Sequence, residues 1–286
     1  MLENKDMVKE CLRNVIDLKK LFKYDEYVII SLLNELGKIE DVDVVFEKAV
    51  ENDYVEVVEL LLKDERVNPA VGGNFAIRIA AENGYTKLVE LLLKDGRVNP
   101  TVCDNYAIRW AIGNGHIQVV ELLLKDERVN PAAEDDYAIG VAAKNGHEKV
   151  VELLLKDNRV NPAADNNYAI RLAAKNGHEK VVELLLKDKR VNPAAEDNYA
   201  IRWAAENGHE KVVELLLKDE RVNPAAEDNY AIRWAALYGH VKVVELLLKD
   251  ERVNLTVDYN LVIWYAERES HTQVVKMLKE AIKKSK

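Results

Sequence analysis

Hydrophobic and polar residues follow one another in a fixed order that recurs every 31 residues along most of the chain. The stretch YAIRWAAEN, which begins at Tyr199, places small and branched apolar residues on one side and contains no helix breaker before Gly208. The next stretch, HEKVVELLLKD, carries valines and leucines across a face wide enough to contact a helix on either side. The pattern therefore predicts a short first helix and a second helix that forms an inner layer.

The residues around the predicted helices indicate turns and a loop. Asn198 precedes the first helix and is expected to cap its free N–H groups, whereas Gly208 is expected to end that helix in the left-handed conformation. After the second helix, the stretch ERVNPAAED contains a proline, which disfavours helix at the preceding Asn223. An exposed, extended loop is predicted there, so that each unit consists of helix, turn, helix and projecting loop.

Some units are nearly identical in sequence. Residues 179–209 and 210–240 differ at three positions, Lys189/Glu220, Glu206/Leu237 and Asn207/Tyr238. Self-similarity at a fixed period predicts a solenoid, in which each unit buries its apolar faces against its neighbours. The register places the units at residues 44–74, 75–105, 106–136, 137–167, 168–198, 199–229, 230–260 and 261–286, which together make one repeat array, 44–286.

The two ends of the chain depart from the repeat. Residues 1–43 align poorly with it, and two amphipathic helices are expected in CLRNVIDLKKLF and YVIISLLNEL. We interpret them as an N-terminal helical cap on the first repeat, with a separate binding element or an eroded repeat as alternatives. In the last repeat, Lys279 replaces a core leucine, as an end repeat requires because its outer face meets water.

The unit resembles the ankyrin repeat. The family's A-A-x-x-G-H sequence corresponds to residues 204–209, its apolar V-V-x-L-L-L run to residues 212–217, and its V-N pair to Val222 and Asn223. The usual T-P-L-H opening is replaced by Tyr-Ala-Ile-Arg, and the unit is shorter than the usual 33 residues. The variant resembles ankyrin arrays of some protists and of large DNA viruses of amoebae. The resemblance implies an all-α, ankyrin-type helical repeat solenoid of about eight helix-turn-helix units with projecting loops.

Composition narrows the classes of partner. With 48% apolar and 32% charged residues the chain can fold, and its net charge of -9 argues against a nucleic-acid binder, whose binding face would be basic. No apolar run approaches the roughly 20 residues that span a bilayer, so no membrane segment is expected. Cys11 and Cys103 form no pattern, which favours a reducing compartment. We predict a cytoplasmic protein (host cytoplasm if viral) whose partners are proteins.

The repetition of the sequence argues against a metal site and against an active site. All six histidines occupy one repeat position, and a stack holds equivalent atoms about 8–10 Å apart, whereas ligands that share a zinc ion each lie about 2 Å from it. We therefore interpret the histidines as hydrogen-bonding residues that hold the turn between helices. An active site needs unlike groups in one pocket, and no nucleophile, phosphate-loop or metal-ligand motif is present. We predict that the protein is not an enzyme and binds no metal or cofactor.

Arginines recur in the predicted first turn of the first helix, where the helix macrodipole disfavours cations. They are Arg78, Arg109, Arg171, Arg202 and Arg233. Loop carboxylates are candidate partners in an internal ladder that stabilises the loops, and contact with a ligand is the alternative. These carboxylates are Asp104, Asp135, Asp197 and Asp228. Gly140 interrupts the arginine series in the fourth repeat.

In ankyrin arrays the binding surface combines the projecting loops with the solvent side of the first helix. At that position the seventh repeat has Leu237 and Tyr238 in place of Glu206 and Asn207. Because buried aromatic anchors dominate interface energies, we expect a partner-binding patch in this region. Its candidate residues are Trp203, Trp234, Leu237, Tyr238, Tyr259, Trp264 and Arg268. We expect Leu237 and Tyr238 to be exposed, whereas for Trp203 and Trp234 packing between helices is the favoured interpretation.

The loops form a predicted acidic rim. Its residues are Glu134, Asp135, Asp165, Glu196, Asp197, Glu227 and Asp228. Such a rim favours a basic partner by steering association, and a solubilising role for the same charges is the alternative. We therefore predict a non-catalytic scaffold that binds one protein partner on its concave side. The alternatives are a structural component that associates with itself or with a particle, and a designed or consensus-like array. A monomer is expected, with self-association as the alternative.

Overall fold

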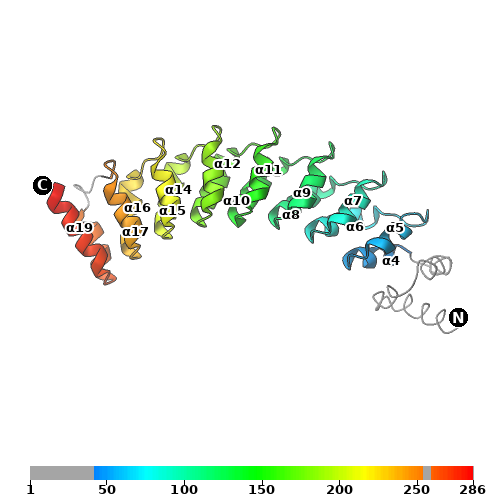
Figure 1. Cartoon of the computed structure of the whole chain (residues 1–286), viewed down its shortest axis with the longest axis horizontal. Coiled ribbons are helices and arrows are strands. Elements are labelled where there is room, and N and C mark those ends of the chain that lie inside the picture. Colours follow the sequence, from blue (N-terminus) through cyan, green and yellow to red (C-terminus); the bar gives the residue numbers. More distant parts are fainter. Residues whose placement is uncertain (1–41, 254–258, 286) are drawn as a thin grey trace. The chain divides into compact units, whose positions relative to one another are not determined.

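The computed structural model describes residues 42–253 and 259–285, and within these ranges every regular element is a helix (Figure 1). The chain divides into two compact units, one up to Asn130 and one from Pro131 onwards. The described helices of the first unit are α4 (Val42–Glu51), α5 (Val55–Leu61), α6 (Val71–Glu82), α7 (Thr86–Leu93), α8 (Val102–Gly113) and α9 (Ile117–Leu124). The predicted cap at residues 1–43 lies almost wholly outside the described residues.

The second unit continues the same succession of helix pairs. Its helices are α10 (Ala133–Asn145), α11 (Glu148–Leu155), α12 (Ala164–Lys175), α13 (Glu179–Lys187), α14 (Ala195–Glu206), α15 (Glu210–Leu217), α16 (Ala226–Leu237), α17 (Val241–Lys249), α18 (Tyr259–Arg268) and α19 (Thr272–Ser285). Within each unit, first helices contact first helices, second helices contact second helices, and the two helices of a pair contact each other. The predicted all-helical repeat solenoid is confirmed.

The core of each repeat lies between these helix layers. In the sixth repeat Ala204 and Ala205 of α14 are fully buried, and so are Val213 and Leu216 of α15. Small alanine side chains let the first helices of adjacent repeats approach closely, and the branched side chains of the second helix fill the remaining space. Gly208 joins α14 to α15 with a φ of 74°, which confirms the predicted left-handed end of the first helix.

A left-handed turn precedes each regular first helix from the second to the seventh repeat. Before the first helix of the sixth repeat its residues are Glu196, Asp197 and Asn198, with φ between 53° and 62°, and the Asn198 N–H donates to the Ala194 carbonyl oxygen at 3.0 Å. Non-glycine residues rarely adopt this conformation, and asparagine and aspartate do so most readily. The pair Gly72 and Gly73, which stands in the turn before the second repeat, adopts it without a β-carbon.

The prediction that Asn198 caps the first helix is wrong. Its side-chain Oδ1 instead accepts the backbone N–H of Asn223 in the following loop, at 2.6 Å. The same bond links successive loops within each unit, from Asn99 to Asn74 at 2.7 Å and from Asn192 to Asn167 at 2.6 Å. The asparagine thus fixes the loop of the next repeat, because its left-handed backbone points the side chain away from its own helix.

The loop after each second helix is held to the preceding repeat by an arginine. Arg221 forms an ion pair with Asp219 at 2.7 Å, and its other guanidinium nitrogen donates to the Val191 carbonyl oxygen at 2.8 Å. The Asp219 side chain is mostly buried, and the bonds from Arg221 lower the pKa of its carboxyl group. The same carbonyl bond recurs from Arg97, Arg128, Arg190 and Arg252. The loop predicted to be extended and exposed therefore buries Val222 and Pro224.

The histidines form hydrogen bonds, as predicted, and these bonds join neighbouring repeats. His209 Nε2 lies 2.9 Å from the Lys175 carbonyl oxygen, and the ring covers Gly177, where an added β-carbon would lie 2.6 Å from Nδ1. The same carbonyl bond is made by His116, His178, His240 and His271. Glycine at the end of each first helix is therefore required twice, for its positive φ and for the space that the next imidazole fills.

Candidate functional site

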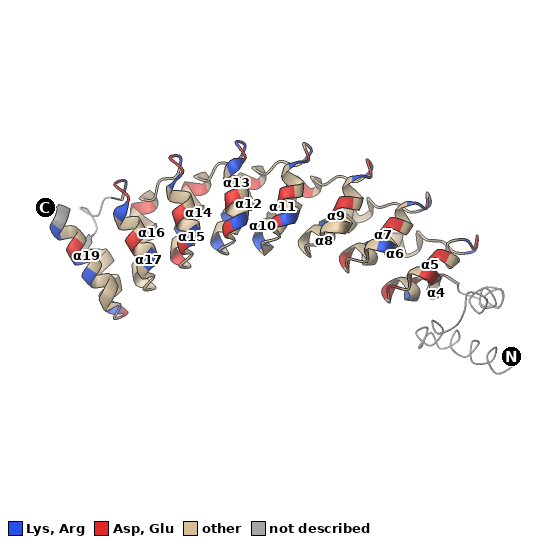
Figure 2. Ribbon diagram, in the orientation of Figure 1, with Lys and Arg blue, Asp and Glu red and all other residues tan. Residues whose placement is uncertain are grey.

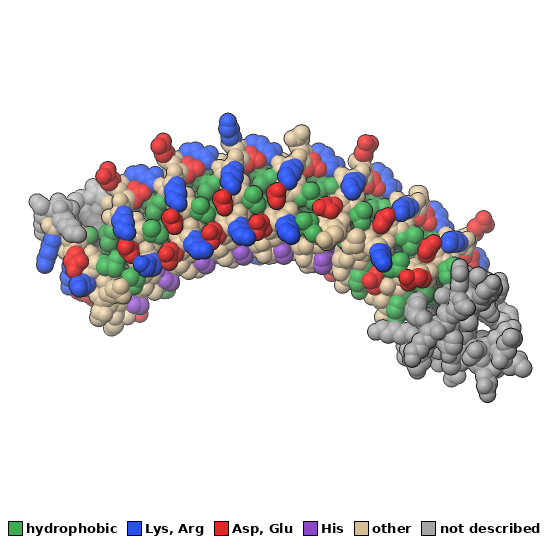
Figure 3. Space-filling view, viewed as in Figure 1, with side chains coloured by type: hydrophobic (Ala, Val, Ile, Leu, Met, Phe, Trp, Pro, Cys, Tyr) green, Lys and Arg blue, Asp and Glu red, His purple; other side chains and the backbone are tan. Residues whose placement is uncertain are grey.

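The second helices present paired charges. On α13 the Lys187 Nζ lies 2.8 Å from a Glu183 carboxylate oxygen, and Lys211 of α15 lies 3.1 Å from Glu179. Figure 2 shows acidic and basic segments side by side on α13 and α15, and in Figure 3 the two signs alternate over the visible face. Such exposed pairs contribute little energy, about 0–1 kcal/mol each, and leave no strong field on this face.

The left-handed turns carry exposed carboxylates. The predicted rim residues all lie at turn positions and are all exposed: Glu134, Asp135, Asp165, Glu196, Asp197, Glu227 and Asp228. Their carboxylates face solvent because a left-handed backbone turns these side chains outward while the third residue of each turn points to the next loop. The first helices and left-handed turns are therefore the candidate binding face.

The arginine ladder exists, but its acceptors differ from those predicted. Arg202 Nη2 donates to the backbone carbonyl oxygen of Glu196 at 2.9 Å, rather than to the Asp197 carboxylate. Arg171 bonds in the same way to the Asp165 carbonyl oxygen, and Arg233 to that of Glu227. Each of these guanidinium groups thus bonds a backbone carbonyl group of the left-handed turn and not a turn carboxylate.

Three of the ladder arginines also lie against a tyrosine of the next repeat. The Arg171 guanidinium carbon is 5.3 Å from the centre of the Tyr199 ring, and that of Arg202 is 5.2 Å from the Tyr230 ring. In the first unit Arg78 lies 5.3 Å from the Tyr106 ring. A guanidinium held between backbone carbonyls and an aromatic face is thus the regular arrangement of this protein.

Aromatic side chains form a ladder across α14, α16 and α18. We use the name aromatic ladder for Tyr199, Trp203, Tyr230, Trp234, Tyr238, Trp264 and Tyr265. Their ring centres are 5.3 Å apart for Tyr199 and Trp203, 5.5 Å for Tyr230 and Trp234, and 5.8 Å for Trp234 and Tyr238. The ladder continues to the last repeat, where Tyr265 lies 6.5 Å from Trp234 and 5.2 Å from Trp264.

The exposed part of the ladder lies toward its C-terminal end. Tyr238 is 50% exposed and Trp264 is 51% exposed, whereas Trp203, Trp234 and Leu237 are half-buried. Lys175 lies 4.1 Å from the Trp203 ring centre, and Arg268 lies 5.7 Å from that of Trp264. The side chain of Tyr259 lies outside the described residues. Except for Tyr259, the predicted patch is therefore brought together on one set of first helices.

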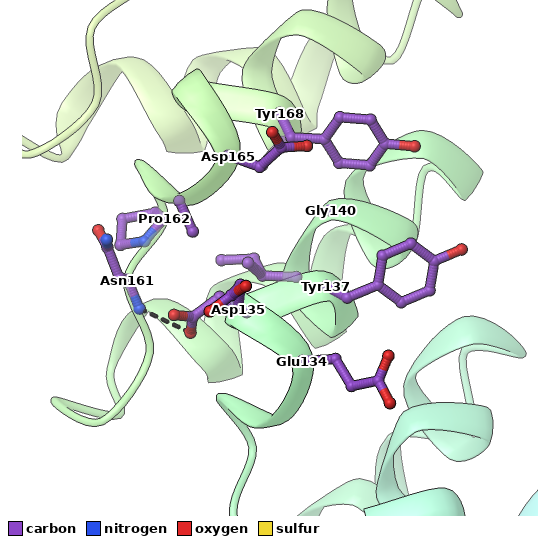
Figure 4. A pocket seen from close by; sticks show the side chains of 12 residues that line it. Glu134, Asp135, Tyr137, Gly140, Asn161, Pro162, Asp165 and Tyr168 are labelled. Atoms are coloured by element: carbon purple, nitrogen blue, oxygen red, sulfur yellow. Dashed lines mark hydrogen bonds between the residues drawn. The ribbon is translucent and has the colours of Figure 1, made fainter. Parts of the chain in front are cut away.

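A cavity of about 510 Å³ opens between α10 and α12, where the arginine series is interrupted (Figure 4). Its deeper wall contains the buried residues Ile139, Gly140 and Ala169, and Glu134 and Asp165 line it at the exposed turns. Tyr137 and Tyr168 extend from the two helices in the same direction. A β-carbon at Gly140 would overlap the Tyr168 ring, so this ring occupies space that the arginine side chain takes in other repeats.

The cavity is electrostatically negative. Asp136, the third residue of its left-handed turn, accepts the Asn161 backbone N–H at 2.8 Å. Burial raises the pKa of the Asp136 carboxyl group, and the neighbouring Asp135 raises it further. Burial also raises the pKa of the Tyr168 hydroxyl, and the nearby Tyr137 and Asp165 act in the same direction. The twelve lining residues include no lysine or arginine.

Sequence reasoning missed three residues of this face. Trp110 occupies the repeat position of Trp203 and Trp234, stacks on Tyr106 at 5.4 Å and is 44% exposed. Tyr137 and Tyr168 belong to the cavity. Both tyrosines share the repeat position of Tyr199, which the sequence shows, but their environment depends on Gly140, which lies three residues from Tyr137 on α10 and against the Tyr168 ring of α12.

The described residues offer no group of three or more histidine, cysteine or acidic side chains arranged to hold a metal ion. Cys103, in the left-handed turn before α8, is a free, exposed thiol. No helix in the described ranges has both the length and the apolar character needed to cross a bilayer.

A family model described as "Ankyrin repeats (3 copies)" matches the chain at residues 46–135, 109–197, 139–228 and 201–286. Taken together, these matches extend over all of the described helix pairs. No curated protein matches the chain.

Proposed function

The chain belongs to the ankyrin repeat family, whose members generally mediate protein–protein interaction, and we propose that it is a non-catalytic scaffold that binds a protein partner through its first helices and left-handed turns. The aromatic ladder is the main contact, and the exposed carboxylates of the turns guide a basic partner to it. Surface charge of one sign raises association rates more than it strengthens the bound complex.

The observation that carries this proposal is the pair of large, exposed rings at the end of the ladder. Tyr238 and Trp264 are each about half exposed although both rest on other aromatic rings. These ring contacts, stacked for Tyr238 and edge-on for Trp264, fix the orientation of both side chains before binding, so a partner that covers them loses little side-chain entropy. Tyrosine and tryptophan held in this way are the residue types that dominate interface energies.

The sixth repeat provides a natural reference for this surface, because it has polar residues where the seventh has Leu237 and Tyr238. In the sixth repeat Glu206 accepts the Tyr230 hydroxyl at 2.6 Å, and Asn207 donates to the Trp203 carbonyl oxygen at 2.8 Å. The double substitution Leu237→Glu/Tyr238→Asn restores this polar pair at the equivalent position. It is therefore expected to keep the fold, because the neighbouring repeat already accommodates the same residues.

The test is affinity purification from the native cell followed by quantitative mass spectrometry. We expect the double variant to lose a partner that the unmodified protein retains, with an affinity drop of about 30-fold or more for a loss of about 2 kcal/mol. Trp110→Ala is the matched control, because it removes an exposed tryptophan at the same repeat position in the first unit. Equal recovery of every partner by the double variant would refute the aromatic ladder as the binding surface.

Self-association is a second candidate function, favoured by the exposure of Trp264 in the last described helix pair. It predicts a mass that increases with protein concentration in analytical ultracentrifugation, and a monomeric mass for Trp264→Glu. A concentration-independent mass for the unmodified chain would exclude it.

A further inference from the structure

We propose that the aromatic ladder binds a proline-rich segment of a partner protein in the polyproline II conformation, and this inference rests on the scaffold function proposed above. The segment runs along the stack of first helices, so that every third residue faces a ring of the ladder. Three properties of the ladder favour this ligand: its free hydrogen-bond donors, the spacing of its rings and the charge beside them.

The aromatic ladder presents hydrogen-bond donors that no group in the described part of the chain satisfies. The indole N–H groups of Trp203 and Trp234 have no partner among the described residues, and neither is buried, so both reach solvent. The hydroxyl of Tyr238 and the indole N–H of Trp264 belong to exposed side chains and likewise have no partner there. The ladder therefore matches a ligand that supplies acceptors.

A polyproline II helix is such a ligand. Proline has no backbone N–H, and the polyproline II conformation forms no internal hydrogen bonds, so its carbonyl groups remain free. An α-helix uses its carbonyl groups to bond its own N–H groups, and an edge strand presents N–H groups together with carbonyl groups. Indole N–H groups donate but do not accept, so they satisfy the carbonyl groups of a proline-rich segment and leave no N–H unpaired.

The rings recur at the period of this helix. Trp203, Trp234 and Tyr265 occupy the same repeat position on α14, α16 and α18, and each of these helices contacts the next. Packed helices lie about 8–10 Å apart, and one turn of polyproline II, three residues of about 3.1 Å each, advances about 9 Å. Residues three apart in this helix share one face, whereas residues three apart in a β-strand point to opposite faces. One residue in three can therefore meet the ring of each successive repeat.

The ladder is the only run of successive aromatic residues at this position among the described repeats. The position is aromatic in one other repeat, at Trp110, whose neighbouring repeats have Ile79 and Val141 instead. An isolated ring offers a periodic ligand one contact, whereas the ladder offers one contact in each of three repeats. Trp110 is therefore a reference ring outside the proposed site.

Charge beside the ladder favours basic residues between the prolines. Exposed carboxylates lie in the left-handed turns before α14 and α16, at Glu196, Asp197, Glu227 and Asp228. Cations also suit the rings themselves, as Lys175 shows by lying 4.1 Å from the ring centre of Trp203. We therefore expect a segment with proline at every third position and arginine among the intervening residues.

The direct test measures the affinity of three fluorescein-labelled peptides by anisotropy at physiological salt concentration. The first consists of three Pro-Pro-Arg units followed by proline. The second has three Gly-Ser-Arg units followed by glycine, which keeps the charge and removes the preference for polyproline II. The third is the D-amino-acid form of the first, whose helix has the opposite hand.

We expect the first peptide to bind at least about tenfold more tightly than either control, because a preformed helix loses less backbone entropy and one hand fits the rings. Equal binding of the first and second peptides would overturn the proposal. Equal binding of the first peptide and its mirror image would reduce the effect to charge and apolar area, and would overturn it as well.

The indole signals give a second test that needs no substitution. The chain has four tryptophans, at positions 110, 203, 234 and 264, so nitrogen-15 labelling of the indole groups gives four signals in a proton–nitrogen correlation spectrum. We expect the first peptide to move the signals of Trp203 and Trp234 downfield, as a new hydrogen bond does, and to leave that of Trp110 in place. Binding of the peptide without these two shifts would refute the proposed contact.

The variant Trp203→Phe/Trp234→Phe removes the two indole N–H groups and keeps aromatic rings. Other repeats have Val141 and Leu172 at this position, so the variant is expected to fold, which circular dichroism checks. It should weaken the first peptide about tenfold, because two hydrogen bonds are lost. Trp110→Phe is the matched control and should change the affinity less than about twofold. An unchanged affinity in the folded double variant, or an equal loss in the control, would contradict the role of the indole donors.

The two proposals fail in different ways. If Leu237→Glu/Tyr238→Asn loses the cellular partner while the three peptides bind alike, the scaffold function stands and the proline-rich ligand falls. If the first peptide is preferred and moves the indole signals, while every cellular partner survives Leu237→Glu/Tyr238→Asn, recognition of proline-rich segments stands and the role of the ladder in binding those partners falls.

Discussion

The contact between Gly177 and His209 allows a quantitative test of how neighbouring repeats are held together. Gly177 has a φ of 75°, and an added β-carbon would lie 2.6 Å from His209 Nδ1. Gly177→Ala therefore imposes two separable costs. One is the strain of an L-residue in the left-handed conformation, and the other is displacement of the imidazole from its hydrogen bond with Lys175.

The expected magnitude follows from those two terms. The left-handed backbone costs about 1–2 kcal/mol for a residue with a β-carbon. Displacing the ring breaks a 2.9 Å bond to the Lys175 carbonyl oxygen, which contributes about 0.5–1.5 kcal/mol. We therefore expect Gly177→Ala to lower the free energy of unfolding by about 2–3 kcal/mol and His209→Ala by about 1 kcal/mol. The double variant should lose about as much as Gly177→Ala alone, because the bond is already broken.

The assay is urea denaturation of all four members of this double-mutant cycle, followed by far-ultraviolet circular dichroism. The structural reasoning predicts a coupling energy of about 1 kcal/mol between the two positions. Gly73→Ala supplies a measure of strain alone, because its φ is 65° and no atom lies within 4 Å of an added β-carbon. Strict additivity of the two substitutions, or equal costs for Gly73→Ala and Gly177→Ala, would refute the claim that the imidazole fills the glycine site.

Three further outcomes are expected in denaturation experiments. Asp136→Asn should stabilise the second unit at pH 7 by about 0.5 kcal/mol. Burial raises the native pKa of Asp136, so the ionised carboxylate destabilises the fold at pH values above that pKa. This destabilisation disappears as the pH falls below the ordinary carboxyl pKa. A stabilisation by Asp136→Asn that persisted in acid would therefore contradict the assignment. Arg221→Gln should cost about 1 kcal/mol at neutral pH. The Arg221 bonds lower the native pKa of Asp219, so their contribution is present above the ordinary carboxyl pKa and is lost as the pH falls through the lowered value; a pH-independent difference would argue against the pair. Glu196→Gly should raise the midpoint of unfolding, because glycine removes left-handed strain at a φ of 53°, and a lower midpoint would show that the carboxylate side chain stabilises the turn.

The helix pairs were predictable because their determinants are local. The apolar spacing of α14 and α15 and the glycine between them follow from helix geometry within one unit. The exposure of Tyr238 was also predictable, since it replaces Asn207 between two repeats that differ at only three positions. Leu237, which the same comparison predicted to be exposed, is half-buried instead. Comparison of near-identical repeats isolates such a change without knowledge of the packing.

The left-handed turns and their acceptors could not be predicted in the same way. Asn198 has the residue type and position of a helix cap, and its real role depends on a bond to Asn223 in the next loop, 25 residues away. Arg202 likewise lies among carboxylates in sequence, yet the backbone conformation of Glu196 presents a carbonyl oxygen to it. The tendency of asparagine to cap a helix, and of arginine to pair with a carboxylate, depends on nearby residues in the sequence. Here the conformation of the turn and of the adjacent repeat decides which partner each side chain reaches.

The hydrogen bonds between repeats all have the same direction. Arg221 and His209 donate to carbonyl groups of the repeat before them, and the backbone N–H of Asn223 donates to the preceding turn. A regular repeat thus presents the same donors to the repeat before it and the same acceptors to the repeat after it. Duplication or loss of a 31-residue segment recreates the same junction, as the close identity of residues 179–209 and 210–240 illustrates. Whole repeats should therefore be gained or lost without any compensating mutation at the join.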